Sequence, residues 1–217
     1  MTKKKRTPPP PRAQAPQRRY QPTTAGFGPR AKLIAAAIAV AVVATVVIAV
    51  AATRGGGGGA ATGDVARKLA AAGCTFKTYP NLGQDHVESL TPTPKYNSFP
   101  PTSGPHYVEP APWNFYDSPV DSQVRVVHNL EHGGIVVQWG SKVPPATVEQ
   151  LRRFWQESPN GLLFAPLPKL GGTIALTAWT HLATCRRFQK KAFTAFRDAF
   201  RAKGPERIPL DQLTPGS

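Results

Sequence analysis

The sequence predicts an α+β domain with a small mixed or antiparallel sheet, flanking helices and a long ordered loop, preceded by one transmembrane helix. Three observations lead to this prediction: an uncharged apolar run, several short β-branched runs, and segments with apolar residues at helical spacing. The helical and strand patterns are interspersed along the chain. We expect four regions: a tail (1–32), a membrane span (33–53), a tether (54–63) and a folded domain (64–217).

The tail is basic and rich in proline. It holds nine of the 27 Lys and Arg residues and no acidic residue, and it has almost nothing apolar to bury. Such a composition cannot offset the entropy cost of ordering, which predicts disorder. Residues 55–217 carry 17 basic and 12 acidic residues, so the net charge of +15 belongs mainly to the tail. We therefore expect no nucleic-acid partner, but we do expect attraction between the tail and anionic lipids.

Residues 33–53 form a run of 21 residues without a charge. A helix of this length is about 31 Å long, close to the hydrocarbon thickness of a bilayer. Basic residues precede the run and only Arg54 follows it directly, which predicts a cytoplasmic N-terminus and an extracytoplasmic domain at the plasma membrane. A cleaved signal peptide is the alternative, but its apolar core is normally about 7–15 residues long. The glycine-rich residues 54–63 are typical of a flexible tether.

The folded domain begins with a predicted short helix over residues 64–73, with Asp64 as its N-cap and Gly73 as its C-terminal stop. Residues 76–122 are crowded with proline, asparagine, serine and glycine, yet they also contain many aromatic side chains. So long an irregular segment inside a domain is usually functional or disordered, and its aromatics argue against disorder. We expect an ordered loop that wraps over the core.

The C-terminal half supplies the predicted sheet and two more helices. Strands are expected in VRVV (124–127), GIVVQWG (134–140), GLLFAP (161–166) and GTIALTAW (172–179). A helix is expected in residues 144–158, and a last one in residues 185–204, where Gly204 marks its end. The last helix has an apolar stripe of Phe188, Ala192, Phe196 and Phe200. Its other face should be solvated and carries Arg187, Lys190, Lys191, Arg197 and Arg201.

The two cysteines, Cys74 and Cys185, both follow the predicted span. Outside the cell they would be oxidised, and an even count permits one disulfide. No C-x-x-C motif is present, so a structural bridge is favoured over a redox role.

The segment HNLEH (128–132) is the densest group of polar residues in the chain. In a helical turn, His128, Glu131 and His132 stand at i, i+3 and i+4 on one face, with Cβ atoms about 5–6 Å apart. In a strand the two histidines would be about 13 Å apart, too far to share an ion. Gly133 follows directly and favours a helix that stops there. We expect a single helical turn between two strands.

This spacing predicts a divalent metal site. Four of the five histidines lie between residues 86 and 132, and we expect His86, His106, His128 and His132 as ligands, with Glu131 and Ser103 supporting them. Imidazole suits zinc or Cu(II). A Cu(I) site is not expected, because Met1 is the only methionine and the cysteines are expected to be paired.

Other functions are compatible with the same residues. The order H-x-x-E-H also occurs in a class of zinc peptidases, which would make Glu131 the general base of a hydrolase. Ser103 is a weak candidate nucleophile, because the G-x-S-x-G context is missing. A different class is a metal-free interaction module, in which the loop aromatics dock a partner protein or an envelope polymer: Tyr107, Trp113, Phe115 and Tyr116.

Taken together, NSFPPTSGPHY, VVHNLEHGGIVVQWG, ALTAW and AFRAKGPER resemble the bacterial domain of unknown function 3105 over about residues 73 to 208. The resemblance implies a basic tail, one span, a tether and this domain, and no established activity. The polar positions that match are Cys74, His86, Pro100, Pro101, Ser103, Gly104, His106, His128, Glu131, His132, Gly133 and Cys185. His181 matches none of these motifs and is left out of the predicted site.

Overall fold

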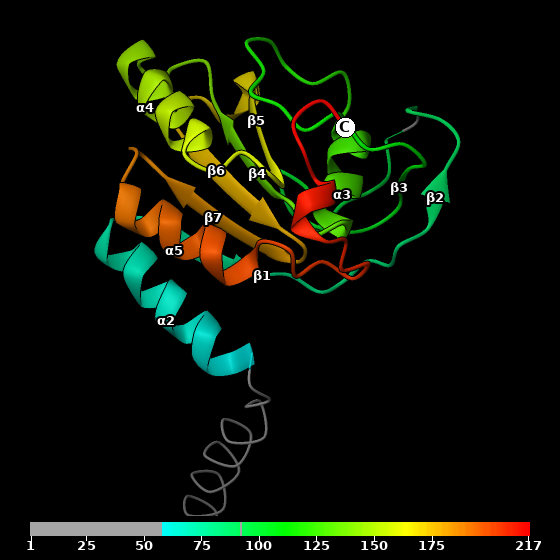
Figure 1. Cartoon of the computed structure of the whole chain (residues 1–217), viewed down its shortest axis with the longest axis horizontal. Helices are drawn as coiled ribbons and strands as arrows, with labels where there is room; N and C mark the ends of the chain where they lie inside the picture. Colours follow the sequence, from blue (N-terminus) through cyan, green and yellow to red (C-terminus); the bar gives the residue numbers. More distant parts are fainter. Residues whose placement is uncertain (1–57, 92) are drawn as a thin grey trace, which may run out of the picture. The chain divides into compact units, whose positions relative to one another are not determined.

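A five-stranded mixed sheet forms the centre of the computed structural model, which describes residues 58–91 and 93–217 (Figure 1). Its order is β1-β7-β6-β4-β5, and its strands are β1 Thr75–Thr78, β4 Ile135–Trp139, β5 Leu162–Pro166, β6 Ile174–Ala178 and β7 His181–Cys185. β4 and β5 pair in parallel, and the remaining neighbours pair antiparallel. The predicted α+β class with a mixed sheet is confirmed.

Helices cover both faces of this sheet (Figure 1). They are α2 Gly58–Ala71, α3 Gln123–Glu131, α4 Pro145–Gln156 and α5 Lys190–Phe200, with short 3-10 turns η1 Pro168–Leu170 and η2 Leu210–Gln212. Because alternate residues of a strand point to opposite faces, Ile135 and Val137 pack towards α2, α4 and α5, whereas Val136 packs towards α3. The site described below lies on the α3 side.

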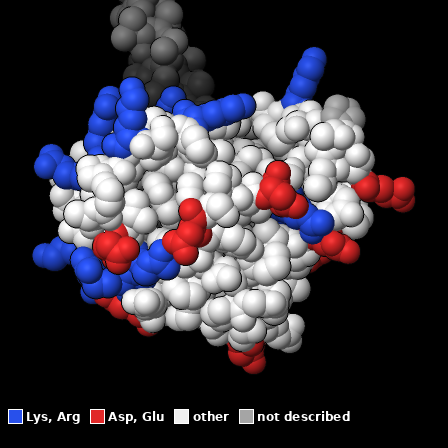
Figure 2. Space-filling view, turned by 90° about the horizontal axis from the view of Figure 1, so that it is seen from above, with Lys and Arg blue, Asp and Glu red and all other residues white. Residues whose placement is uncertain are grey.

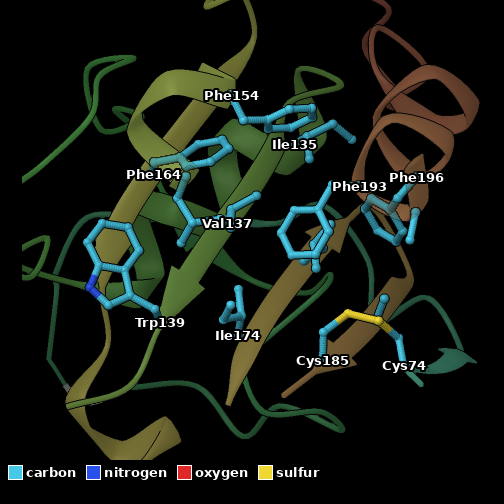
Figure 3. Close-up of a cluster of buried hydrophobic side chains, with 14 of the residues drawn as sticks. Cys74, Ile135, Val137, Trp139, Phe154, Phe164, Ile174, Cys185, Phe193 and Phe196 are labelled. Atoms are coloured by element: carbon cyan, nitrogen blue, oxygen red, sulfur yellow. A yellow bond between two sulfur atoms is a disulfide. The ribbon is translucent and has the colours of Figure 1, made fainter. Parts of the chain in front are cut away.

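The larger core lies between the sheet and α2, α4 and α5 (Figure 3). Phe164 of β5, Phe154 of α4 and Phe193 of α5 are each 2% exposed or less. Burial of each such side chain stabilises the fold by about 1.5–3 kcal/mol. The predicted disulfide between Cys74 and Cys185 is present at one edge of this core, with an S–S distance of 2.05 Å.

The predicted tail (1–32) and span (33–53) lie outside the described residues. Within residues 58–91 and 93–217, no helix is long and apolar enough to cross a membrane. The first helix differs from its prediction, because α2 begins at Gly58 and so includes residues 58–63 of the expected tether. Asp64 is therefore not the N-cap. It lies inside α2, where its carboxylate pairs with Lys68 one turn later at 2.7 Å.

The prediction of a strand over residues 124–127 is wrong, because these residues belong to α3. Ser122 caps this helix by accepting a hydrogen bond from the Val124 amide, and Val126 and Leu130 bury one side of the helix against β4 and β5. This packing outweighs the β propensity of the valines. The end predicted for the helix, directly before Gly133, is confirmed by the φ of +87° at this glycine.

Other elements also differ from their predictions. Thr75–Thr78 was assigned largely to the long loop but forms β1, and β7 was not predicted. The last helix ends at Phe200, so Gly204 is not its stop. Two of the basic residues predicted for the solvated face of the last helix are not simply solvated, because Arg197 of α5 lies over the Phe154 ring and Arg201, directly after α5, donates to Ser158 Oγ at 2.8 Å.

Charged side chains of both signs lie next to one another on the face shown in Figure 2, and uncharged side chains cover much of the rest. Among the described residues as a whole, several charged side chains form exposed ion pairs, such as Lys190 with Glu157 at 2.5 Å. Exposed pairs of this kind contribute about 0–1 kcal/mol each. They therefore set the surface charge more than the stability of the fold.

We predict that replacing both cysteines (Cys74→Ala with Cys185→Ala) lowers the free energy of unfolding by about 4–5 kcal/mol, because the bridge closes a loop of 111 residues in the unfolded chain. Equilibrium urea unfolding followed by tryptophan fluorescence measures the change. As a control, reductant should destabilise the wild type by a similar amount and leave the double variant unaffected. A loss below about 1 kcal/mol would contradict the prediction.

Candidate metal centre

A second, very short sheet begins the site. β2 His86–Val87 and β3 His106–Tyr107 pair in parallel, with His86 directly opposite His106. Neighbouring strands are about 4.8 Å apart, so this register places the two imidazoles side by side, with ring centroids 4.9 Å apart. Two histidines that are 20 positions apart in the sequence thus become neighbours.

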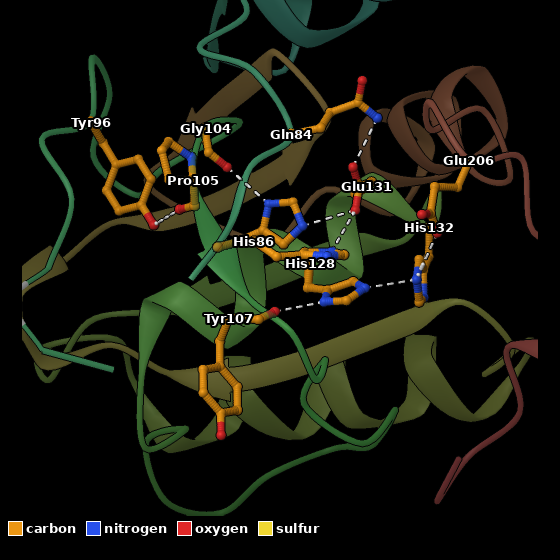
Figure 4. A network of polar contacts seen from close by, with 11 residues as sticks. Gln84, His86, Tyr96, Gly104, Pro105, Tyr107, His128, Glu131, His132 and Glu206 are labelled. Atoms are coloured by element: carbon orange, nitrogen blue, oxygen red, sulfur yellow. Dashed lines mark hydrogen bonds and ion pairs between the residues drawn. The ribbon is translucent and has the colours of Figure 1, made fainter. Parts of the chain in front are cut away.

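α3 supplies the other half of the site (Figure 4). His128 and Glu131 lie in its last turn, and the His132 amide caps it by donating to the His128 carbonyl at 3.1 Å. The helix is held in place by Asn129, whose side chain donates to the carbonyl of Ala111 at 2.7 Å and accepts from the amide of the same residue at 3.0 Å. The one-face spacing predicted for HNLEH is therefore present on a helix.

The inner group, which we define as His86, His106, His128 and Glu131, offers four ligand atoms that all lie within 4.8 Å of one another. His106 Nε2 is 2.8 Å from Glu131 Oε2, and His86 Nε2 is 3.8 Å from the same oxygen. Glu131, His106 and His128 are 4% exposed or less. Ligand atoms on one ion are about 3–4 Å apart, so small side-chain shifts would bring this group around a metal.

Two backbone carbonyls decide which ring nitrogens carry protons. His106 Nδ1 donates to the Gly104 carbonyl at 2.9 Å, and His128 Nδ1 donates to the Tyr107 carbonyl at 2.7 Å. A carbonyl only accepts, so each Nδ1 holds the proton, and in a neutral ring Nε2 is left with a free lone pair. Both residues belong to the inner group. The Gly104 backbone has a φ of +120°, a value that residues with a side chain rarely adopt.

Burial keeps the imidazole rings of His128 and His132 neutral. It lowers the pKa of His128 to about 4, and the positive charges that the neighbouring His132 and His106 would carry also lower it. Burial likewise lowers the pKa of His132, although the nearby Glu206 carboxylate acts in the opposite direction. At neutral pH His128 and His132 are therefore unprotonated at one nitrogen each and are competent to bind a metal.

Glu131 is held on both sides. Gln84 donates to its Oε1 at 2.8 Å, while its Oε2 faces His106 Nε2. A carboxylate and an imidazole nitrogen whose ring proton is already on Nδ1 are both acceptors, so either a further proton or a cation must lie between them. A divalent cation meets this requirement for all members of the inner group at once.

The outer group, defined as His128, His132 and Glu206, adjoins the inner group through its shared residue. His128 Nε2 and His132 Nε2 are 2.9 Å apart, and His132 Nε2 is also 2.9 Å from Glu206 Oε2. The neighbouring acceptors are His128 Nε2 and Glu206 Oε2, and the single proton on His132 Nε2 is the only one that they can share. The outer group is thus a second place where a cation would satisfy unpaired acceptors.

The structure therefore brings together three of the four expected ligands, His86, His106 and His128, and it places His132 in the adjacent group. Glu131 was expected only to support the ligands, but its carboxylate lies among them. Ser103 is buried and accepts from the Leu82 amide at 3.2 Å, so it holds the loop that leads to Gln84 and His86.

His181 lies elsewhere, with its ring against the rings of Phe76 and Phe200. Sequence reasoning missed two participants, Gln84 and Glu206. Gln84 lies two residues before His86, and this closeness in the sequence was the signal that could have added it to the predicted site. Glu206 is separated from His132 by more than seventy positions, and no local spacing connects them.

Three of the four loop aromatics expected to dock a partner are covered by other protein groups. Trp113 and Phe115 are 2% and 7% exposed and belong to the core, while the Tyr107 ring is covered by the guanidinium of Arg125 at 4.5 Å. For a hydrolase, Glu131 would have to reach a water molecule, but both of its oxygens are engaged with protein groups. Neither alternative gains support from the geometry.

Comparison with known proteins identifies one family. The profile described as "Protein of unknown function (DUF3105)" matches residues 86–211, more than half of the chain, and this range includes both groups. No curated protein and no solved structure matches the chain.

We predict that His128 in the metal-free protein carries its proton on Nδ1 and stays neutral until the pH falls to about 4. Long-range ¹H–¹⁵N correlation spectra recorded from pH 8 to pH 3.5 would show a non-protonated Nε2 signal throughout the neutral range. A protonated Nε2 at pH 7, or a titration midpoint near the ordinary value of 6.5, would contradict this.

Proposed function

The chain belongs to the DUF3105 family of proteins of unknown function, and we propose that it binds a divalent transition-metal ion, Zn²⁺ or Cu²⁺, through the inner group. The observation that supports this most directly is the pair of buried imidazoles, His106 and His128. Each has its Nδ1 proton committed to a backbone carbonyl, which leaves Nε2 as the nitrogen it can offer to an ion; His106 Nε2 lies 2.8 Å from Glu131 Oε2, and His128 Nε2 lies 2.9 Å from His132 Nε2. Ring orientation fixed through the other nitrogen is the usual arrangement of metal-binding histidines.

The donor set favours particular ions. Three imidazole nitrogens and one carboxylate oxygen suit Zn²⁺ in a four-coordinate site, and the same ligands also bind Cu²⁺. Calcium and magnesium prefer sites made wholly of oxygen, which this group does not offer. Affinities of such sites generally rise towards Cu²⁺, so Cu²⁺ should bind more tightly than Zn²⁺ in solution.

The site is better suited to an exchangeable ion than to a structural one. Structural zinc sites are closed, whereas the side chain of His86 is 46% exposed and leaves one side of the inner group open. The five-stranded sheet, two buried cores and a disulfide are available to stabilise the fold independently of the ion. The proposed role is therefore to capture or hold a metal ion, and the folded state does not depend on it.

The proposal places this activity at the bacterial cell envelope. Residues 33–53 would anchor the chain in the plasma membrane with the tail in the cytoplasm, where it would contact anionic lipids. The disulfide supports an extracytoplasmic domain, because such bridges persist in oxidising compartments. A metal-handling domain on a tether would then meet ions outside the membrane.

We predict that the full chain, purified in detergent without a histidine tag, binds one Zn²⁺ or Cu²⁺ ion in isothermal titration calorimetry. The variants His106→Gln and His128→Gln each remove a buried ligand. They should weaken binding by more than about 100-fold, the upper end of what loss of an outer partner alone causes.

His181→Gln is the matched control, because it removes a histidine that packs on Phe76 and Phe200. It should leave the affinity unchanged. Circular dichroism of every variant, and of the chelated wild type, should show the same folded spectrum. A wild type that binds neither ion, or a control that loses affinity as the ligand variants do, would refute the proposal.

A further inference from the structure

We infer that His132 and Glu206, with the shared His128, form an access position through which the ion passes between solvent and the inner group. This inference rests on the proposed function and adds the route by which the ion exchanges. The geometry that carries it is that both groups share the residue His128. Because its Nδ1 is held by the Tyr107 carbonyl, Nε2, 2.9 Å from His132 Nε2, is the one nitrogen that it can offer to either group.

The outer group is already spaced like the ligands of one ion. Two ligand atoms about 2.1 Å from a metal lie about 3.0–3.4 Å apart at right-angle or tetrahedral geometry. The separations between His128 and His132 and between His132 and Glu206 are both 2.9 Å. All three ligand atoms lie within 4.8 Å of one another, so small side-chain shifts would let an ion be received here.

Exposure falls steadily along the proposed route. The side chain of Glu206 is 37% exposed and that of His132 is 19% exposed. His128 follows at 4%, and His106 is fully buried at 0%. A carboxylate at the surface attracts a hydrated cation, and at each inward step protein ligands replace some of the water molecules bound to the cation. The gradient leads from solvent to the buried carboxylate of Glu131.

The protonation of His128 makes the two positions exclusive. Its Nδ1 is committed to the Tyr107 carbonyl, so the ring has one lone pair and can bind only one ion at a time. An ion can keep its bond to His128 Nε2 while it exchanges His132 and Glu206 for His106 and Glu131. His132 binds the ion through Nε2 with its ring proton on Nδ1, so this proton moves through solvent from Nε2 to Nδ1 when the ion arrives and returns when the ion moves inward. The ring stays neutral throughout, and no net proton is gained or lost.

A tight backbone contact fixes Glu206 beside α3. The Ala202 amide donates to the Gly133 carbonyl at 2.8 Å, and the Glu206 amide donates to the Glu131 carbonyl at 3.3 Å. A Cβ atom at Gly204 would lie 2.1 Å from the Glu131 carbonyl oxygen, so only glycine allows this approach. The segment after α5 is thus docked directly on the end of the helix that carries the ligands.

Stopped-flow measurements with Zn²⁺ and a fluorescent chelator test the inference on the full chain. The variants Glu206→Gln and His132→Gln should slow both association and dissociation by the same factor, about 10-fold, and leave Kd unchanged, because a transit position affects both directions equally. Glu157→Gln is the matched control. It removes a carboxylate of similar exposure, 44%, that forms an ion pair with Lys190 on α5, and it should alter neither rate.

Three results would overturn the inference. Unchanged rates in both variants would mean that the ion enters elsewhere, past His86. A weaker Kd with faster dissociation alone would make His132 and Glu206 ligands of the resting site. Two Zn²⁺ ions bound at saturation would show that the groups are not exclusive. A wild type without any bound ion would instead refute the proposed function, and the inference with it.

Discussion

The hydrogen bond from His128 Nδ1 to the Tyr107 carbonyl is the interaction on which the site depends. It joins α3 to β3, two elements that no local sequence signal connects. It also fixes Nε2 as the nitrogen with a free lone pair, and this is the only ring nitrogen that His128 can offer to an ion in either group. If this bond were absent, the imidazole could rotate or change tautomer, and neither group would keep its arrangement of acceptors.

The site also concentrates acceptors where water is largely excluded. His106, His128 and Glu131 are buried, and a buried polar group without a partner costs free energy. The Nδ1–H groups of His106 and His128 already donate to backbone carbonyls, so no ring proton of a neutral imidazole is left at Nε2. A cation or additional protons must supply what is missing, and this shortage makes the group a stronger candidate than a count of histidines would.

The sequence alone was sufficient for part of this picture. The i, i+3, i+4 spacing of His128, Glu131 and His132 and the glycine after them correctly predicted a helical end at this point, although the expected single turn between two strands is the end of the nine-residue helix α3, with His132 as its C-cap. The short apolar runs of β4 and β6, which contain β-branched residues, were likewise recognised as strands from their local sequence. Residues 124–127 show the limit of such reasoning, because burial of the helix against β4 and β5, and not the β propensity of valine, determines their conformation.

Long-range features were beyond local patterns. The parallel pairing of His86 with His106 arises from two strands of two residues each, too short to leave a periodicity. Glu206 reaches His132 only because Gly133 and Gly204 let two backbones touch. The role of Glu131 among the ligands follows from the fold around it, and its place in the motif gave no indication of this.

The brevity of the β2–β3 pair has a further consequence. Segments with so few ladder hydrogen bonds open at a lower free energy than a central sheet, so this corner can unfold locally while β4, β5 and β6 stay intact. An ion held by His86 and His128 would bridge the loop and the helix, and local opening would then have to break a coordination bond. Metal occupancy and hydrogen-exchange protection of the loop would thus be thermodynamically linked, each reporting on the other.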